Sequence, residues 1–395
     1  MIFTTRSAKK GADTLHRLQQ HLLQSGQSSS SNRVTFVPEN VDLANLVSVR
    51  ALSRRLRSSY PKLDSVILNA GLGGWTGIDW PLAIWTVLTD LVHAVSWPCF
   101  KIARAGVVTD PQTSLGKDEE PPLGAVFCAN VFGHYMLAHN VVPLLKKAGD
   151  QDPTTPGRII WVSSLEGTVK LLDVDDIQGL RTLTSYESSK ALTDVLTITS
   201  NLPSTAPWVK SFYSTDNDDP VDSSETPVTQ PNMYLSHPGI CGSGILPLSL
   251  PLYYAMMAAF WLARLLGSPW HTLSTYLGAC APVWLALSTQ AALDDAEAPY
   301  RRNGGGGRVK WGSSCSISGC ERPACTEVDG WGYGGVVGPA VTEEDQRRRR
   351  KRGAVDLTQE QKEEFEAVGR ECWRKMEELR IQWDALLDKA EAASS

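Results

Sequence analysis

Tyr186-Glu187-Ser188-Ser189-Lys190 places a phenol and an ammonium four residues apart, shortly after the apolar run Ile159-Ile160-Trp161-Val162. Positions four apart share one face of a helix, about one turn from each other. An ammonium near a tyrosine favours the phenolate, so Lys190 should lower the pKa of Tyr186 from its usual value of about 10. The pair therefore predicts a tyrosine that can donate and accept a proton, as carbonyl reduction requires.

Short apolar runs alternate with helical patterns over the first 240 residues. We expect strands over 1–5, 33–38, 63–69, 158–164 and 233–236, and helices over 11–23, 43–59, about 130–145 and around Tyr186. Thr184 and Glu187 resemble a capping box that would start the last of these helices. Strands that alternate with helices form βαβ units, so the predicted fold class is α/β with a doubly wound, Rossmann-like parallel sheet. Ligands of such sheets bind at the carboxyl ends of the strands.

The composition is that of a folded protein without a nucleic-acid partner. Of the 395 residues, 42% are hydrophobic and 21% charged, and 43 acidic against 38 basic residues give a net charge of -5. That length suits one large α/β domain with extensions, or two domains. The eight cysteines form no disulfide framework, which indicates a reducing compartment. We expect no metal site, because Cys315, Cys320 and Cys325 lack the paired spacing and nearby histidines of zinc sites.

Several segments interrupt or follow the α/β pattern. We expect one domain over 1–300, a glycine-rich and basic loop region over 301–356, and a C-terminal helix over 357–395. The domain carries a tryptophan-rich insertion over 73–123, a polar and acidic loop over 204–231, and an apolar segment over 245–287.

Polar and small residues stand near the predicted strand ends. Asn69-Ala70-Gly71 ends the third strand, where small residues let a cofactor approach the backbone. Ser164 ends the next strand and could donate to a substrate carbonyl. Asn130 lies in a helix, where an asparagine is unfavourable unless its amide bonds something. His134, one turn later, is expected to be structural.

Further candidates flank these residues. Asp42 follows the second strand and could cap the next helix or orient an adenine ring. In Pro238-Gly239-Ile240 the proline removes a donor and the glycine lets the backbone turn. Ser243, a few residues later, could bond a phosphate or an amide.

In this order, the residues of roughly 1–245 resemble the short-chain dehydrogenase/reductase family. The resemblance implies a catalytic tetrad of Asn130, Ser164, Tyr186 and Lys190. Tyr186 would protonate the carbonyl oxygen, and Ser164 would position and polarise it. Lys190 would also bind the nicotinamide ribose, and Asn130 would hold a water in a proton relay. The cofactor would further contact Arg6, Asp42, Asn69, Ala70, Gly71, Pro238, Gly239, Ile240 and Ser243.

Other segments are similar to a group within that family, the fungal sterol 3-keto reductases of ergosterol synthesis. They are Phe3-Thr4-Thr5-Arg6-Ser7, Gly73-Gly74-Trp75-Thr76-Gly77, Ile160-Trp161-Val162-Ser163-Ser164-Leu165-Glu166 and Gly330-Trp331-Gly332-Tyr333-Gly334-Gly335. The resemblance implies reduction of a sterol 3-ketone to the 3β-hydroxyl in the C4-demethylation branch. Arg6 ends the first strand, where a guanidinium can hold a ribose 2′-phosphate, so we expect NADPH.

The sequence departs from the family's pattern at one feature. No Gly-x-x-x-Gly-x-Gly turn, the loop that cradles a pyrophosphate at a helix N-terminus, follows a strand, and Gly304–Gly307 lacks that context. We therefore expect an N-terminally truncated homologue, in which either the chain begins late or cofactor binds poorly. Two alternatives stay open: a reductase of another lipophilic ketone such as a 17-ketosteroid, and a cofactor-deficient interaction protein without catalysis.

The apolar run over 245–266 is just long enough to span a bilayer. It has three interpretations: a membrane span, a sterol entrance resting on the membrane surface with the 73–123 insertion, or a buried substrate lobe. The resemblance implies the cytosolic face of the endoplasmic reticulum membrane, or lipid droplets. It also implies other enzymes of the sterol C4-demethylation assembly as partners, which the C-terminal helix would bind unless it packs on the domain.

Overall fold

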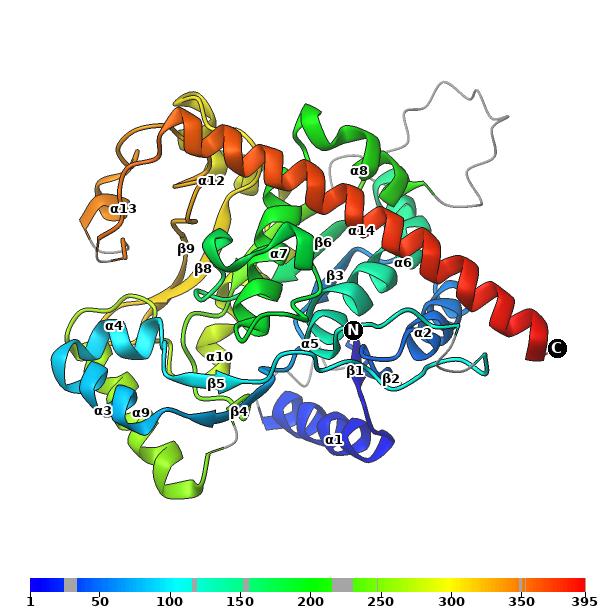
Figure 1. Cartoon of the computed structure of the whole chain (residues 1–395), viewed down its shortest axis with the longest axis horizontal. Helices are drawn as coiled ribbons and strands as arrows, with labels where there is room; N and C mark the ends of the chain where they lie inside the picture. The colour runs from blue at the N-terminus through cyan, green and yellow to red at the C-terminus, as the bar shows by residue number, and fades with distance from the viewer. Residues whose placement is uncertain are drawn as a thin grey trace.

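A five-stranded sheet with the order β3-β6-β7-β8-β9 forms the centre of the molecule in this computed structural model (Figure 1). The strands are β3 (Ser65–Leu68), β6 (Arg158–Val162), β7 (Asn232–His237), β8 (Lys310–Cys315) and β9 (Glu321–Cys325). The first four are parallel and β9 is antiparallel to β8. The structure describes residues 1–24, 34–115, 119–151, 156–214, 230–246, 248–347, 350–351 and 353–394.

A second, two-stranded parallel sheet consists of β1 (Ile2–Thr5) and β2 (Val37–Asn40), with α1 (Ala8–Gln24) between them in the chain. Among the described residues, neither strand pairs with the five-stranded sheet. The α/β class with a parallel sheet is confirmed, but its strands form two separate sheets. The second strand begins later than the expected 33–38, and residue 33 lies outside the described residues.

Helices pack on the central sheet largely where the sequence predicts them. They are α2 (Leu46–Ser59), α5 (Ala125–Phe127), a π-helical turn η2 (Cys128–Phe132), α6 (Gly133–Gln151) and α7 (Ser185–Thr199). Helix α2 begins after Asn45, whose side chain accepts a hydrogen bond from the Ser48 amide. Asn45, rather than the predicted Asp42, is therefore the N-cap residue.

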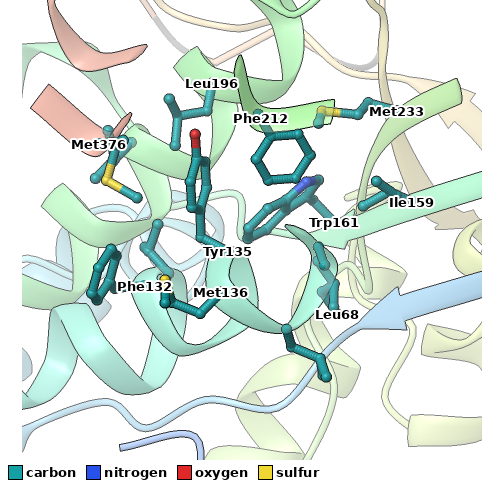
Figure 2. Close-up of a cluster of buried hydrophobic side chains, with 14 of the residues drawn as sticks. Leu68, Phe132, Tyr135, Met136, Ile159, Trp161, Leu196, Phe212, Met233 and Met376 are labelled. Atoms are coloured by element: carbon teal, nitrogen blue, oxygen red, sulfur yellow. The ribbon is translucent and has the colours of Figure 1, made fainter. Parts of the chain in front are cut away.

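The main core lies between these helices and the sheet (Figure 2). Tyr135 of α6 packs against Phe212, with ring centroids 4.7 Å apart. Trp161 of β6 and Met376, near the C-terminus, border the same cluster. Phe212 belongs to α8 (Ala206–Tyr213), which forms where the sequence predicts a polar loop; residues 215–229 of that loop lie outside the described residues.

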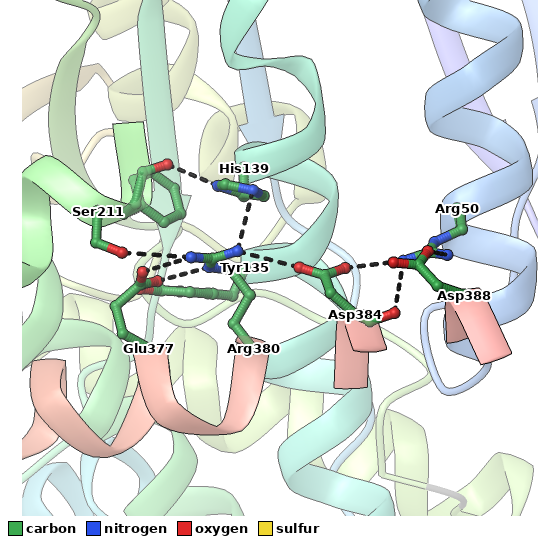
Figure 3. Close-up of polar contacts among 9 residues, drawn as sticks. Arg50, Tyr135, His139, Ser211, Glu377, Arg380, Asp384 and Asp388 are labelled. Carbon is green, nitrogen blue, oxygen red and sulfur yellow. Dashed lines mark hydrogen bonds and ion pairs between the residues drawn. The ribbon is translucent and has the colours of Figure 1, made fainter. Parts of the chain in front are cut away.

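The C-terminal helix α14 (Gln359–Ser394) runs across the molecule over α7 and α8 (Figure 1). Phe365, Trp373, Met376 and Trp383 of this helix are buried, and the Trp373 indole donates to the Leu196 carbonyl oxygen at 3.1 Å. A polar network joins the same helix to the domain (Figure 3). In it, Tyr135 donates to Glu377 at 2.7 Å, and Arg50 pairs with Asp384 at 3.0 Å. The helix therefore packs on the domain.

The region over 301–356 differs from the expected loop. It contains β8, β9 and the short helix α13 (Glu343–Arg347), and all six residues of β8 are buried. The sequence of β8, Lys310-Trp311-Gly312-Ser313-Ser314-Cys315, has no β-branched residue and little alternation, so its pattern does not predict a strand.

The 73–123 insertion forms an antiparallel pair, β4 (Trp75–Ile78) and β5 (Lys101–Ala103), with α3 (Trp80–Thr89) and α4 (Leu91–Ser96) between them. The apolar segment forms α9 (Leu250–Leu265), which packs against α4, then α10 (Thr275–Gly278) and α11 (Cys280–Leu287). Helix α12 (Gln290–Arg302) and the 3₁₀ turns η3 (Val169–Leu171), η4 (Val174–Asp176) and η5 (Pro203–Thr205) complete the elements. No helix in the described ranges has both the length and the apolar character to cross a membrane.

Candidate active site

The end of β6 and the start of α7 bring the predicted serine, tyrosine and lysine together. Strand β6 ends at Val162 and is followed by Ser163 and Ser164. Tyr186 and Lys190 are buried, with exposed fractions of 7% and 5%. The Ser164 side chain is close enough to the phenol to lower the pKa of Tyr186.

Lys190 donates from Nζ to the Val162 carbonyl oxygen at 2.9 Å, and the same Nζ lies 5.8 Å from the centre of the Tyr186 ring. Burial lowers the pKa of Lys190 to about 8; the Asp194 carboxylate opposes this shift and the Lys310 ammonium adds to it. A lysine side chain with this pKa is present both as the charged ammonium and as the neutral amine at neutral to mildly basic pH.

The pKa of Tyr186 lies in the opposite direction to the prediction. Burial raises it first, and the Glu166 carboxylate raises it further. Lys190 is not among the main causes of the shift; its pKa of about 8 means that it has already lost its charge at the higher pH where the phenol ionises. Spacing along a helix predicted that the two side chains share a face, but not that desolvation would outweigh the charge.

Asn130 connects the loop after β3 to α7. Its Oδ1 accepts a hydrogen bond from the Leu72 amide at 2.8 Å, and its Nδ2 donates to the Leu72 carbonyl oxygen at 3.0 Å and to Ser189 Oγ at 3.1 Å. The expectation that its amide must bond something is confirmed. The predicted role in a water relay stays a prediction.

The Asn69-Ala70-Gly71 loop lies against these residues and is exposed. A Cβ at Gly71 would stand 2.7 Å from Asn130 Oδ1 and 4.0 Å from Lys190 Nζ. His134 donates from Nε2 to the Ala70 carbonyl oxygen at 2.7 Å, and burial lowers the pKa of His134 to about 4. His134 is therefore neutral and holds the loop.

The turn after β7 is built as the sequence suggests. Gly239 has a φ of +68°, and a Cβ there would lie 2.5 Å from the Trp270 carbonyl oxygen. The Ile240 amide donates to that same oxygen at 2.7 Å. Ser243 follows in the half-buried segment that leads to α9.

Arg6 and Asp42 come just after the two strands of the β1-β2 sheet. Arg6 follows β1 and is exposed. Asp42 accepts from the Ala44 amide at 3.0 Å, which makes a turn just before α2. This contact does not test whether Asp42 orients an adenine ring, so that role stays a prediction.

A buried charge cluster beside Tyr186 was not predicted. Lys101 of β5 pairs with Glu166 and with Glu187, the latter at 3.1 Å, and its Nζ lies 3.8 Å from the centre of the Trp75 ring. The Trp75 and Tyr186 ring centroids are 4.7 Å apart. The Glu187 carboxylate therefore forms an ion pair within this cluster.

The capping box predicted for α7 is wrong. The helix does follow Thr184, but the Thr184 side chain makes no capping hydrogen bond. Its Oγ1 instead lies 2.8 Å from Thr182 Oγ1.

A second buried pair, Lys310 of β8 with Asp194 of α7, was also missed. Lys310 lies in the strand that the sequence did not predict. Asp194 stands one turn beyond Lys190, and that spacing is the signal that could have identified it.

Comparison with known proteins places the chain beside sterol-modifying reductases. No family model matches it. A 3-keto-steroid reductase of Aspergillus fumigatus is 72% identical over 398 residues, covering 99% of this chain and 88% of that protein. A 3-keto-steroid reductase of Gibberella zeae is 37% identical over 428 residues, covering 98% and 87%.

Solved structures with a similar arrangement are more distant. A 7α-hydroxysteroid dehydrogenase in complex with NADH and 7-oxo glycochenodeoxycholic acid is 17% identical, with a TM-score of 0.38 over 74% of this chain and 78% of that one. A gluconate 5-dehydrogenase from Burkholderia cenocepacia in complex with NADP and tartrate is 13% identical, with a TM-score of 0.40 over 80% and 84%.

Proposed function

Because the chain belongs to the fungal 3-keto-steroid reductases, a family of short-chain dehydrogenases/reductases, we propose that it reduces the 3-ketone of a sterol to the 3β-hydroxyl in ergosterol biosynthesis, within the C4-demethylation branch. The observation that carries this proposal is the placement of Ser164, Tyr186 and Lys190 at the carboxyl end of β6, where α/β sheets bind their ligands.

The residues at this edge fit the nicotinamide end of a dinucleotide. The exposed Asn69-Ala70-Gly71 loop carries small side chains, and Gly71 stands beside Asn130 and Lys190, so a ribose could reach the Lys190 ammonium. When bound, a reduced nicotinamide supplies the hydride that the sterol C3 receives.

The chain's own groups handle the proton. Tyr186 donates its phenolic proton to the ketone oxygen, and the Ser164 hydroxyl donates a hydrogen bond to the same oxygen. The raised pKa of Tyr186 keeps the phenol protonated, which is the form that reduction consumes. Lys190 contacts the ribose, while Asn130 fixes the loop after β3 by its bonds to Leu72.

The test is NADPH oxidation with a 4-desmethyl 3-keto sterol. Tyr186→Phe should lower kcat by at least about 100-fold, because it removes the proton donor. Tyr276→Phe is the matched control, since Tyr276 is 78% exposed on α10, and it should retain activity. Equal rates for wild type and Tyr186→Phe would remove Tyr186 from the mechanism.

We further propose NADPH as the preferred cofactor. The exposed Arg6 guanidinium follows β1 and is available for a 2′-phosphate. Arg6→Ala should lower the ratio of kcat/KM for NADPH to that for NADH by about ten-fold or more, a loss in the range of a charge-assisted contact. An unchanged ratio would contradict this role.

The same assays separate the two alternatives. Reduction of a 17-ketosteroid with no turnover of the 3-keto sterol would favour the other ketone. The non-catalytic alternative predicts no saturable NADPH binding in a fluorescence titration.

A membrane surface is the proposed setting of the reaction. Helix α3 carries no charged residue, and the one charge of α9, Arg264, is buried in hydrogen bonds to His271 and Thr272. Both helices lie at one end of the molecule (Figure 1). Their exposed apolar side chains include Trp80, Ile84, Trp85, Leu88, Leu250, Tyr254, Trp261 and Leu262. Such a patch suits the interface of a bilayer that dissolves sterols.

Vesicle flotation tests this setting. The double variant Trp85→Ser/Trp261→Ser should lose most binding to phosphatidylcholine vesicles, whereas Ile381→Ser, on the exposed part of α14, should not. Equal flotation of all three proteins would contradict it. Residence at the endoplasmic reticulum or on lipid droplets, and assembly with other C4-demethylation enzymes, are proposals to be tested by imaging and co-purification of the tagged chain.

A further inference from the structure

Two lysines hold the chain just after β6. Lys190 of α7 donates to the Val162 carbonyl oxygen at 2.9 Å, and Lys310 of β8 donates to the Ser164 carbonyl oxygen at 2.7 Å. Both are nearly excluded from solvent, with exposed fractions of 5% and 3%. The two ammonium groups therefore bind the backbone carbonyls of Val162 and Ser164, on either side of Ser163, in the segment that carries the reactive Ser164.

Asp194 interacts with the charges of both lysines. Its Oδ2 accepts from Lys310 Nζ at 2.5 Å, and both side chains are 2% exposed. Its Oδ1 makes no hydrogen bond of ordinary geometry among the described residues; the Ser163 hydroxyl is close enough to lower the pKa of Asp194 but donates to the Lys190 carbonyl oxygen at 3.2 Å. Asp194 follows Lys190 by four residues, so both lie on one face of α7, and each charge shifts the other's pKa toward the ionised form.

A buried carboxylate needs a cationic partner, because removal from water disfavours its charge. Lys310 is that partner now. If Lys310 were lost, Lys190 would be the nearest cation on the same helix face, and the free Oδ1 would be an acceptor for it. Capture of Lys190 by Asp194 would draw the ammonium away from Val162 and from the tyrosine.

We propose that Lys310 is a positioning residue that occupies the Asp194 carboxylate and thereby leaves the Lys190 ammonium at the tyrosine and the ribose. This inference rests on the proposed reductase function, since it assigns Lys190 a task in that reaction. Lys310 acts through its bonds to the Asp194 carboxylate and the Ser164 carbonyl.

A charge-deletion series separates this role from simple stabilisation. Lys310→Met should lower kcat by about ten-fold or more with a smaller change in the sterol KM, as expected for a misplaced catalytic group. The double variant Lys310→Met/Asp194→Asn should recover most of that loss, because the carboxylate that captures Lys190 is gone. Lys310→Arg should retain more activity than Lys310→Met.

Arg308→Met is the matched control. Arg308 precedes Lys310 by two residues, is 12% exposed at its side chain, and donates from its guanidinium to Asn232 of β7 at 3.0 Å; its bond to α7, to the Ile198 carbonyl oxygen, comes from the backbone amide, which Met keeps. It should retain kcat. Thermal melts of all variants show which of them fold, and only folded variants enter the comparison.

A second readout needs neither cofactor nor turnover. Lys190 faces Asp194 and Tyr186 on its own helix, Lys310 on β8 and His134 on α6. In ¹³C-lysine NMR of the cofactor-free protein, with the Lys190 signal assigned by Lys190→Arg, the titration midpoint should rise in Lys310→Met. It should fall in Asp194→Asn, where the Lys310 charge is no longer balanced.

The inference is overturned if the folded double variant is no more active than Lys310→Met, or if the Lys190 midpoint is the same in all variants. Failure of the proposed function looks different: wild type would then reduce no sterol ketone, while the NMR shifts would still follow the charges.

Discussion

At the scale of single residues, burial governs the chemistry of the site more than sequence spacing does. Tyr186 and Lys190 share a helix face as predicted, yet desolvation raises the pKa of the phenol and lowers that of the ammonium to about 8. Both shifts favour the uncharged form, as expected where water is excluded. The structure thus supplies a protonated tyrosine for ketone reduction.

Asn130 is predicted to hold the loop after β3, Asn69-Ala70-Gly71, in its position. Asn130→Ala removes three hydrogen bonds to Leu72 and Ser189 and leaves the Leu72 groups unpaired, which should cost about 2–3 kcal/mol of unfolding free energy. Activity should fall as well, because Gly71 loses its support. Urea unfolding and NADPH oxidation check both parts. Full stability in Asn130→Ala would contradict the role assigned to these bonds.

His134 is predicted to make the protein less stable in acid. Burial lowers its folded-state pKa to about 4, and the Lys190 charge adds to the shift. Between about pH 6.5 and 4, His134 is therefore protonated in the unfolded chain but not in the folded chain. The contribution of neutral His134 to the free energy of unfolding is therefore fully present above pH 6.5. It is lost as the pH falls to about 4, and the whole loss is about 3 kcal/mol.

Urea midpoints between pH 7 and pH 4.5 measure this effect. His134→Gln can still donate to the Ala70 carbonyl oxygen but does not titrate, so its midpoint should fall less steeply with pH than that of wild type. His271, with a pKa also lowered to about 4 by burial, remains in both proteins and cancels in the comparison. Equal slopes would contradict the prediction.

At the scale of elements, the insertion over 73–123 is tied to the active site by one buried lysine. Lys101 of β5 pairs with both Glu166 after β6 and Glu187 of α7, and it covers the Trp75 ring. The sequence indicated a tryptophan-rich insertion but not its position. Three segments distant in the chain meet there, and only tertiary packing brings their charges together.

Lys101→Met is predicted to loosen this hairpin. It leaves two carboxylates without their cation in a buried site, which should cost about 3 kcal/mol or more of unfolding free energy. Lys62→Met is the control: its pair with Asp64 is exposed, so the loss should stay under about 1 kcal/mol. Similar unfolding free energies for the two variants would show that the cluster does not hold the hairpin.

At the scale of the whole molecule, α14 completes the core. Phe365, Trp373, Met376 and Trp383 are each no more than 2% exposed, and they pack on α6, α7 and α8. Arg380 of the same helix bonds to Glu377 and Asp384, and Arg50 of α2 pairs with Asp384 and Asp388 (Figure 3). Helix α2 is thereby joined to the C-terminal helix.

Removal of residues 359–395 is predicted to abolish cooperative unfolding. Each large side chain lost from the core contributes about 1.5–3 kcal/mol, so the four together approach the whole stability of a typical domain. Removal of 392–395 alone, beyond the Arg54–Glu391 pair, should leave the melting transition intact. A sharp melt in the longer deletion would show that the domain folds without α14.

The sequence by itself determined the α/β class, the helices α1, α2, α6 and α7, the strands β1, β3, β6 and β7, the C-terminal helix, and the order of the candidate catalytic residues. These features follow from local periodicity and from short motifs, which any single chain displays. Strands β8 and β9 escaped prediction because β8 lacks a strand pattern and becomes a strand through pairing with β7 on one side and β9 on the other. The division of the parallel strands between two sheets, the pKa directions of Tyr186 and Lys190, and the contacts of Lys101 and Lys310 were decided by tertiary structure alone. The physical reason is that burial and charge pairing depend on segments far apart in the chain, and no spacing along the sequence encodes those distances.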